Sequence, residues 1–213
     1  MARIVCISDT HNLLDKINVP DGDILIHAGD ATIRGTLPEV SKFNEDLGNL
    51  PHKHKIIIAG NHDIGFESES NLFRSLITNA TYLEDSGVEI EGIKFWGSPW
   101  QPQFFDWAFN LNRGPELQEK WALIPSETDV LITHGPPMGI GDLTHRQGSL
   151  EAVNTGCIDL KREVLDRIKP KVHIYGHIHE GFGSRGIQET HFINASILNE
   201  RYQIQNKPII IHL

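Results

Sequence analysis

Five short apolar runs are spaced along the chain, and each ends in a polar or glycine-rich turn. They cover residues 4–7, 23–27, 55–59, 129–133 and 171–175. Runs of this length, rich in Ile, Val and Leu, are typical of strands buried on both faces. Segments with helical spacing lie between them, at 37–47 with Pro38 in the first turn, at 72–77, and at 164–168 before Pro170. This alternation predicts an α/β fold with a largely parallel sheet.

A second group of strands has a different pattern. Residues 88–90 and 93–96 flank Glu91 and Gly92, which predicts a β-hairpin, and the late strands 190–194 and 208–212 have no helix between them. We therefore expect a second, more antiparallel sheet packed on the first.

The chain has 213 residues, 39% of them hydrophobic. This size fits one domain over residues 1–213 with a substantial core.

The turns after the five apolar runs carry side chains that can bind metal ions. They are Asp9 and His11 after the first run, Asp30 after the second, Asn61, His62 and Asp63 after the third, His134 after the fourth, and His177 and His179 after the fifth. The carboxyl ends of parallel strands share one edge of a sheet, where ligands of α/β folds bind. We therefore expect all five groups to converge.

Seven of these side chains form a donor set of Asp, Asn and His: Asp9, His11, Asp30, Asn61, His134, His177 and His179. Oxygen and imidazole donors suit manganese, iron, zinc or similar cations, with magnesium, cobalt and nickel also possible. Seven donors exceed the needs of one ion, and a carboxylate such as Asp30 can bridge two ions ~3.5–4 Å apart. We expect two divalent metal ions.

The charge of the chain limits its partners. The formal net charge is −9, which opposes binding to long nucleic acid because such binding depends on Lys and Arg contacts to phosphates. A small anionic substrate remains compatible, since bound cations make the site itself positive.

The two cysteines form no disulfide framework, and no apolar run approaches ~18 residues. We expect a cytoplasmic protein with no membrane partner; the oligomeric state is not predicted.

The ordered motifs resemble those of the calcineurin-like metallophosphoesterases. The matching set is Asp9-x-His11, Gly29-Asp30, Gly60-Asn61-His62-Asp63, His134 and Gly176-His177-x-His179, and it spans nearly the whole chain. Within that superfamily, Thr133-His134-Gly135-Pro136-Pro137 and Ile193-Asn194-Ala195-Ser196 look like the small metallophosphoesterase-domain-containing proteins of animal brain. That group is similar to class III cyclic-nucleotide phosphodiesterases. The resemblance implies a four-layer α/β sandwich in which two packed mixed sheets are flanked by helices. It also implies two metal ions, most often manganese.

The resemblance also implies roles for single residues. It assigns Asp9, His11, Asp30 and His179 to a first metal, and Asp30, Asn61, His134 and His177 to a second. His62 would act beside the phosphate as a general acid or charge stabiliser, with Asp63 as the partner that orients its ring. Some animal relatives carry glycine where His177 stands, so the histidine favours catalysis here.

These inferences predict a dinuclear metal-dependent phosphodiesterase that hydrolyses small phosphodiesters, with cyclic nucleotides among the candidates, by a metal-activated hydroxide. A phosphomonoesterase or protein phosphatase is the alternative within enzymes, and a metal- or nucleotide-binding scaffold with little turnover is the alternative outside them.

Other residues have open roles. The aromatic loop of residues 96–109 either buries its own rings over the sheet or offers a surface for a nucleobase. Arg146 either meets phosphate or lies in a solvated loop. His27 and His173, inside apolar strands, are expected to be core histidines with satisfied ring nitrogens.

Overall fold

The first sheet combines strands from the N-terminal part of the chain with the last strand. The computed structural model describes residues 1–145 and 151–213. The sheet order is β15-β1-β2-β3-β4. The strands are β1 (Arg3–Ile7), β2 (Ile24–Ala28), β3 (His54–Ile58), β4 (Thr81–Tyr82) and β15 (Ile209–His212). β1 to β4 are parallel, and β15 pairs antiparallel with β1 at one side.

The second sheet has the order β13-β14-β12-β9-β6-β5. Its strands are β5 (Ser86–Ile90), β6 (Ile93–Ser98), β9 (Val130–Thr133), β12 (Val172–Tyr175), β13 (Gly183–Ile187) and β14 (Thr190–Asn194). The four central strands are parallel, and β5 and β13 are antiparallel at the two edges. The predicted hairpin is confirmed: Glu91 and Gly92 both have positive φ, at 53° and 79°, as a two-residue hairpin turn requires.

Two sequence expectations about strand pairing were wrong. The five apolar runs do not share one sheet, because β9 and β12 belong to the second sheet and only β1, β2 and β3 to the first. The last strand, β15, joins the first sheet rather than the second. A continuous apolar run indicates that a strand is buried, but it carries no information about which strand lies beside it.

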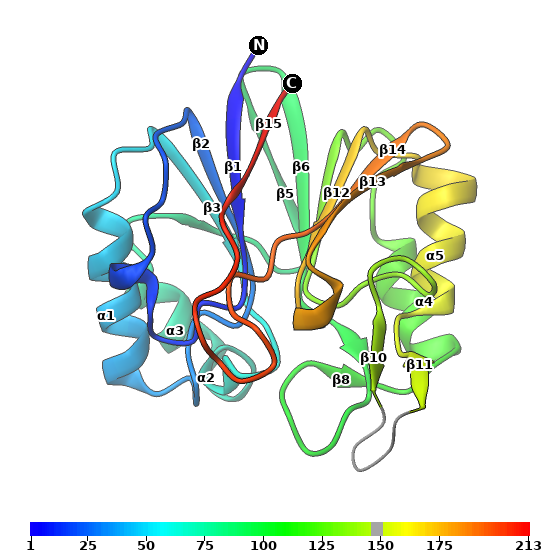
Figure 1. Cartoon of the computed structure of the whole chain (residues 1–213), viewed down its shortest axis with the longest axis horizontal. Coiled ribbons are helices and arrows are strands. Elements are labelled where there is room, and N and C mark those ends of the chain that lie inside the picture. Colours follow the sequence, from blue (N-terminus) through cyan, green and yellow to red (C-terminus); the bar gives the residue numbers. More distant parts are fainter. Residues whose placement is uncertain (146–150) are drawn as a thin grey trace.

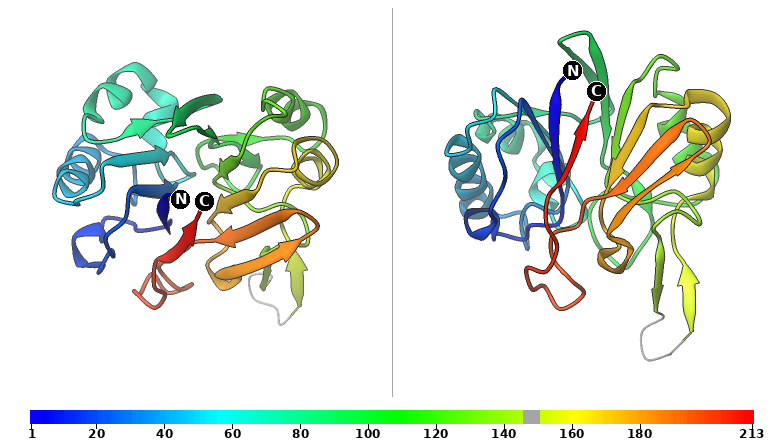
Figure 2. Two further views of the ribbon diagram at one scale, coloured as in Figure 1. Left: turned by 90° about the horizontal axis from the view of Figure 1, so that it is seen from above. Right: turned by 45° about the horizontal axis from the view of Figure 1, so that its top comes forward.

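Helices cover the outer faces of both sheets, and Figures 1 and 2 show the resulting layers. The helices are α1 (Leu37–Gly48), α2 (Ile64–Ser68), α3 (Ser70–Leu76), α4 (Pro115–Ala122), α5 (Ile158–Arg162) and its π-type continuation η2 (Glu163–Ile168), with short 3-10 turns η1 (Leu14–Lys16) and η3 (His179–Gly181). Among these described helices, none has both the length and the apolar character needed to cross a bilayer. Two strand pairs, β7 (Gln101–Pro102) with β8 (Asn110–Leu111) and β10 (Leu143–His145) with β11 (Ala152–Asn154), lie outside the main sheets.

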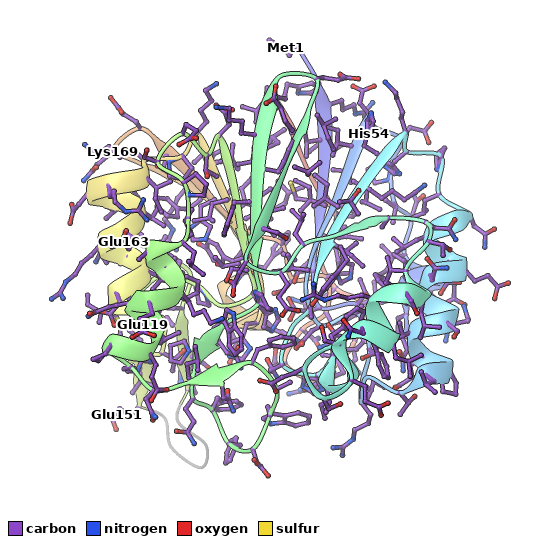
Figure 3. The ribbon with its side chains drawn as sticks, turned by 180° about the vertical axis from the view of Figure 1, so that it is seen from behind. Met1, His54, Glu119, Glu151, Glu163 and Lys169 are labelled. Atoms are coloured by element: carbon purple, nitrogen blue, oxygen red, sulfur yellow. The ribbon has the colours of Figure 1, made fainter. Side chains whose placement is uncertain are left out.

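The core follows the alternation of side chains along each strand. In β1, Ile4 and Cys6 belong to the cluster between the two sheets, whereas Val5 and Ile7 belong to the cluster beneath α1 and α3. A third cluster joins Leu131 of β9 to α4, α5 and η2. Figure 3 shows side chains filling these spaces. The four-layer α/β sandwich of two mixed sheets flanked by helices is confirmed.

Candidate metal centre

The candidate ligands lie where parallel strands of both sheets end, toward the lower side of Figure 1. Asp9 and His11 follow β1, Asp30 follows β2, Asn61 follows β3, His134 follows β9, and His177 and His179 follow β12. Backbone hydrogen bonds link these turns within each sheet, from Asp9 N to Gly29 O at 3.0 Å and from Gly176 N to His134 O at 2.9 Å. The convergence expected at one sheet edge thus occurs between the edges of two sheets.

Three of the histidines share the same orientation. The Nδ1 atom of each forms a hydrogen bond with a backbone carbonyl: His134 with Ala28 at 3.0 Å, His11 with Thr32 at 3.0 Å, and His179 with Asn199 at 2.8 Å. A carbonyl only accepts, so each Nδ1 carries the proton. Each Nε2 therefore has a lone pair when the ring is neutral, which is the arrangement of histidines that bind metals.

The Nε2 atoms point at carboxylates. His134 Nε2 lies 3.4 Å from Asp30 Oδ1, and His11 Nε2 lies 3.9 Å from Asp30 Oδ2. His179 Nε2 lies 3.5 Å from Asp9 Oδ1. His11 Nε2 is buried without a hydrogen-bond partner, which is costly unless something else satisfies it.

The donor atoms form three overlapping groups. In each group the ligand atoms lie within 4.8 Å of one another: Asp9, His11 and His179; His11, Asp30 and His62; and Asp30, His134 and His177. Asn61 adds an oxygen, since its Oδ1 lies 3.0 Å from His134 Nε2. The donor types, their spacing and the unpartnered His11 Nε2 all fit divalent cations.

The backbone adopts an unusual conformation at these residues. Asp9, His11, Asp30 and His177 all have positive φ, at 53°, 39°, 54° and 68°. This left-handed conformation costs a non-glycine residue about 1 kcal/mol or more. Four such residues at one site indicate that the fold holds the turns against local preference, which is typical of functional sites.

The carboxylates are fixed by neighbouring donors. Asp9 accepts from the His177 N–H at 3.1 Å and from the Ser196 hydroxyl at 2.7 Å. Asp30 Oδ1 accepts from the His62 N–H at 2.8 Å. Glycine is needed beside both: a Cβ on Gly176 would lie 2.1 Å from Asp9 Oδ2, and one on Gly60 would lie 2.3 Å from Asp30 Oδ1.

Asp63 does not orient His62, and that part of the sequence prediction was wrong. The Asp63 carboxylate accepts from Gly60 N, Ala31 N, and both Thr32 N and Thr32 Oγ1, at 2.7 to 3.2 Å. All of these donors belong to the turns after β2 and β3. Asp63 therefore joins two ligand-bearing turns.

His62 finds its ring partner elsewhere. Its Nδ1 lies 2.9 Å from the carbonyl oxygen of Ile33. Because a carbonyl oxygen only accepts, Nδ1 is the donor in this hydrogen bond. The indole of Trp107 stacks on the ring with centroids 4.2 Å apart. The other ring nitrogen, Nε2, is not used by this hydrogen bond and can interact with a bound substrate.

The sequence also matches a known family over most of its length. The family profile described as calcineurin-like phosphoesterase matches residues 2–181. The chain belongs to the calcineurin-like phosphoesterases. This phosphoesterase is 45% identical over 234 residues to human "Metallophosphoesterase domain-containing protein 1", covering 99% of this chain and 71% of that protein. It is 42% identical over 225 residues to a UPF0046 protein of Caenorhabditis elegans, covering 99% of this chain and 75% of that one.

A solved structure is also similar to this phosphoesterase. It is described as that of "a Novel Archaeal Phosphodiesterase", with 18% identity and a TM-score of 0.45 over 98% of this chain and 99% of that chain. The family match and the groups of Asp and His side chains make the chain a metal-dependent phosphoesterase.

The histidines at the candidate site of the phosphoesterase have shifted pKa values, some raised and some lowered. Burial alone would lower the pKa of His134, but the Asp30 carboxylate outweighs burial and raises it to about 9. The same balance between burial and the bond to Asp9 raises the pKa of His179 to about 9. Burial lowers the pKa of His177 to about 3. Without cations, His134 and His179 thus hold protons that offset the two carboxylates.

Asp63 has a different electrostatic environment. Burial, and then the nearby Asp30 carboxylate, raise its pKa to about 6, although the hydrogen bonds from Thr32 and Gly60 act in the opposite direction.

The buried His27 and His173 are core histidines, as expected, but only one ring nitrogen of each has a hydrogen-bond partner. Nε2 of His27 contacts Thr10 and Nε2 of His173 contacts Thr133, whereas Nδ1 of each has no partner.

Sequence reasoning missed the residues that support the ligands from the last part of the chain. Ser196 follows β14 and holds Asp9, and the Asn199 carbonyl holds His179. The rule applied to the other strands would have found Ser196, because it too is a polar residue just beyond a strand. No comparable signal marks Asn199, whose contribution is a backbone atom.

A cavity of about 800 Å³ opens beside the ligands. Asp30, Asn61, His177 and His179 line one part of it, and Phe104 and Phe105 line another. The aromatic loop buries some of its rings and exposes others: Phe109 is fully buried, while Phe104 and Phe105 are 47% and 67% exposed. Arg146 lies outside the described residues.

Proposed function

We propose that this phosphoesterase binds two divalent cations that share Asp30 and hydrolyses small phosphodiesters. The observation that carries the proposal is the position of the Asp30 carboxylate. Its Oδ2 faces His11 at 3.9 Å and its Oδ1 faces His134 at 3.4 Å. A carboxylate with one oxygen toward each of two ligand groups is suited to bridge two ions.

The ligands divide between the two cations. The first cation would be held by Asp9, His11, Asp30 and His179, and the second by Asp30, Asn61, His134 and His177. The first set includes a buried nitrogen, His11 Nε2, without another partner. Manganese is the first candidate on the resemblance to the calcineurin-like metallophosphoesterases, and the carboxylate and amide oxygens among the donors suit this ion.

When bound, such cations supply positive charge to the phosphoryl oxygens and lower the pKa of water toward neutrality. The chain's own contribution begins with His62. Its Nδ1–H is bonded to Ile33 O, so Nε2 is the atom that can hold a proton for the leaving oxygen or stabilise charge on the phosphate. Asp63 contributes by holding the two turns that carry Asp30 and His62.

The cavity supports a small substrate with a flat apolar group. A volume of about 800 Å³ falls in the usual range of small-molecule sites. The Phe104 ring is 47% exposed and lies 5.9 Å from the His177 ring, so a flat organic group on a phosphoester bound at the candidate ligands would lie near an aromatic surface. Nucleotides, including cyclic nucleotides, combine a phosphoester with such a ring, whereas the net charge of −9 opposes long nucleic acid.

A phosphomonoesterase or protein phosphatase remains the alternative enzyme, since the same ligands serve either ester. A scaffold that binds metal or nucleotide without turnover is the alternative outside enzymes. The cytoplasm is the location we propose, where two free buried thiols, Cys6 and Cys157, remain reduced.

The test is hydrolysis of bis-p-nitrophenyl phosphate by the metal-stripped protein, with and without added manganese. We expect manganese to restore turnover, and His177→Ala to lose at least about 100-fold because one ligand of the second cation is removed. His212→Ala is the matched control, because His212 is exposed on β15, away from the ligand turns.

Each alternative predicts a different result. Turnover of p-nitrophenyl phosphate but not of the diester would favour the phosphomonoesterase. Two bound metal ions per chain with no hydrolysis of either ester would favour the scaffold.

A further inference from the structure

His62 is held by three contacts from two loops. Its backbone N–H donates to Asp30 Oδ1 at 2.8 Å, in the turn after β2. Its ring Nδ1 donates to Ile33 O at 2.9 Å, further along the same connection. The third contact is the face of Trp107, from the loop between β7 and β8, with ring centroids 4.2 Å apart and planes inclined by 31°.

Trp107 is placed by the backbone around it. The next residue, Ala108, donates its N–H to the carbonyl of Asn61, at 3.2 Å, so this end of the aromatic loop is bonded directly to the residue before His62. Ala108 and Phe109 are buried, whereas Phe104 and Phe105 at the tip are exposed. The guanidinium of Arg34 lies over the indole, with Cζ 5.5 Å from the ring centroid. The stack on His62 is thus anchored at its base.

The stack supplies a restraint that the hydrogen bonds lack. A single bond at Nδ1 fixes one atom of the imidazole but allows the ring to tilt about that point. The indole blocks tilting on one face, and the His11 ring, at 4.7 Å and nearly perpendicular, limits the ring on another side. Proton transfer depends steeply on such orientation, because small displacements of a catalytic group lower the rate by large factors.

We propose that Trp107 is a positioning residue for His62, and that its indole keeps Nε2 directed at the leaving oxygen of the substrate. The inference rests on the proposed function and adds a residue outside the ligand motifs. It predicts that Trp107 matters most for substrates whose leaving group needs a proton.

The experiment compares two methyl aryl phosphates with the manganese-loaded protein. p-Nitrophenolate leaves without protonation, whereas phenolate is a poorer leaving group that gains from a general acid. We expect Trp107→Leu to lower kcat for methyl phenyl phosphate by about 10-fold to 100-fold, and kcat for methyl p-nitrophenyl phosphate by less than about 3-fold. Trp107→Phe, which keeps a stacking ring, should recover most of the loss.

The double variant with His62→Asn tests whether the effect acts through His62. In the His62→Asn protein, Trp107→Leu should cause no further preferential loss on the phenyl ester, because the group that it positions is gone. Equal losses on both esters, or the same preferential loss without His62, would overturn the proposal. Trp107→Gln is the second variant if Trp107→Leu does not fold.

A spectroscopic measurement separates this proposal from the proposed function. If the native protein hydrolyses no ester with any metal, the proposed function fails. The ring position is then judged from the NMR signal of His62 Hε1, assigned by its loss in His62→Asn. Stacking shields this proton, so Trp107→Leu should move the signal downfield and Trp107→Phe should restore it in part. An unchanged signal would show that Trp107 does not hold the ring.

Discussion

The carboxylate of Asp63 accepts hydrogen bonds from both the backbone N–H and the hydroxyl of Thr32, at 3.0 and 2.7 Å. It also accepts from Ala31 N at 3.2 Å and Gly60 N at 2.8 Å. One buried side chain therefore ties the turn that carries Asp30 to the turn that carries Asn61 and His62. The spacing between these ligands depends on it.

Asp63→Asn should weaken both the fold and metal binding. An amide can offer only one oxygen to these donors, and its NH₂ would face an N–H. We expect a loss of about 2–3 kcal/mol in the free energy of unfolding of the metal-free protein, measured with urea, and about 10-fold to 100-fold weaker manganese binding. Asp106→Asn, at an exposed position, should change neither. Native-like affinity in Asp63→Asn would contradict this role.

Gly176→Ala should weaken metal binding, whereas Gly186→Ala should be tolerated. A Cβ at Gly176 would lie 2.1 Å from both Asp9 Oδ2 and Ser8 Oγ, whereas one at Gly186 would meet nothing within 4 Å. We expect metal content, measured by atomic absorption after dialysis, to fall by at least half in Gly176→Ala, since Asp9 must move, and to stay unchanged in Gly186→Ala. Equal metal content in the two variants would show that Asp9 is not a required ligand.

Metal binding should release protons at neutral pH. In the metal-free protein the pKa values of His134 and His179 are raised to about 9, so both rings are protonated at pH 7.5 and a cation must displace their protons. Manganese affinity should therefore rise with pH until about pH 9 and then level off.

Calorimetric titration in two buffers of different ionisation enthalpy measures this release. We expect about two protons per chain at pH 7.5, and about one fewer in His134→Asn. Binding heats that do not depend on the buffer would contradict the assignment.

His173 should make the protein sensitive to acid. Burial lowers the pKa of this core histidine to about 3, whereas in the unfolded chain it is ~6.5. The unfolded state therefore binds a proton that the folded state excludes between these values. The contribution of His173 to the free energy of unfolding is therefore fully present above about pH 6.5. It falls by about 1.4 kcal/mol per pH unit as the pH drops toward 3.

His173→Phe removes this titration while keeping a ring among Tyr175 and Phe192. The difference in unfolding free energy between pH 7.5 and pH 5 should be about 2 kcal/mol smaller in the variant than in the native protein, as measured with urea at each pH. His212→Phe, on the surface, is the control. A variant that loses as much stability as the native protein at pH 5 would exclude His173 as a source of acid sensitivity.

The sequence alone identified the residues that the structure brings together at the candidate site. Each candidate ligand lies in the turn after a short buried strand, and both the apolar run and the turn after it are local patterns. The convergence of Asp9, Asp30, His134 and His177 followed from strand direction, and it occurs although the five strands are divided between two sheets and do not share one. The hairpin at Glu91 and Gly92 was predictable for the same reason, since a two-residue turn depends on its own backbone conformation.

The tertiary structure alone decided the partners of these residues. The family resemblance implied that Asp63 orients His62, but Asp63 bonds to the turn after β2 and His62 stacks on Trp107, which is 45 positions away. Ser196 reaches Asp9, and β15 pairs with β1, across nearly the whole chain. Local propensity determines which segments form strands and turns. Contacts between distant segments depend on how all the layers pack together, and that packing is a property of the whole fold.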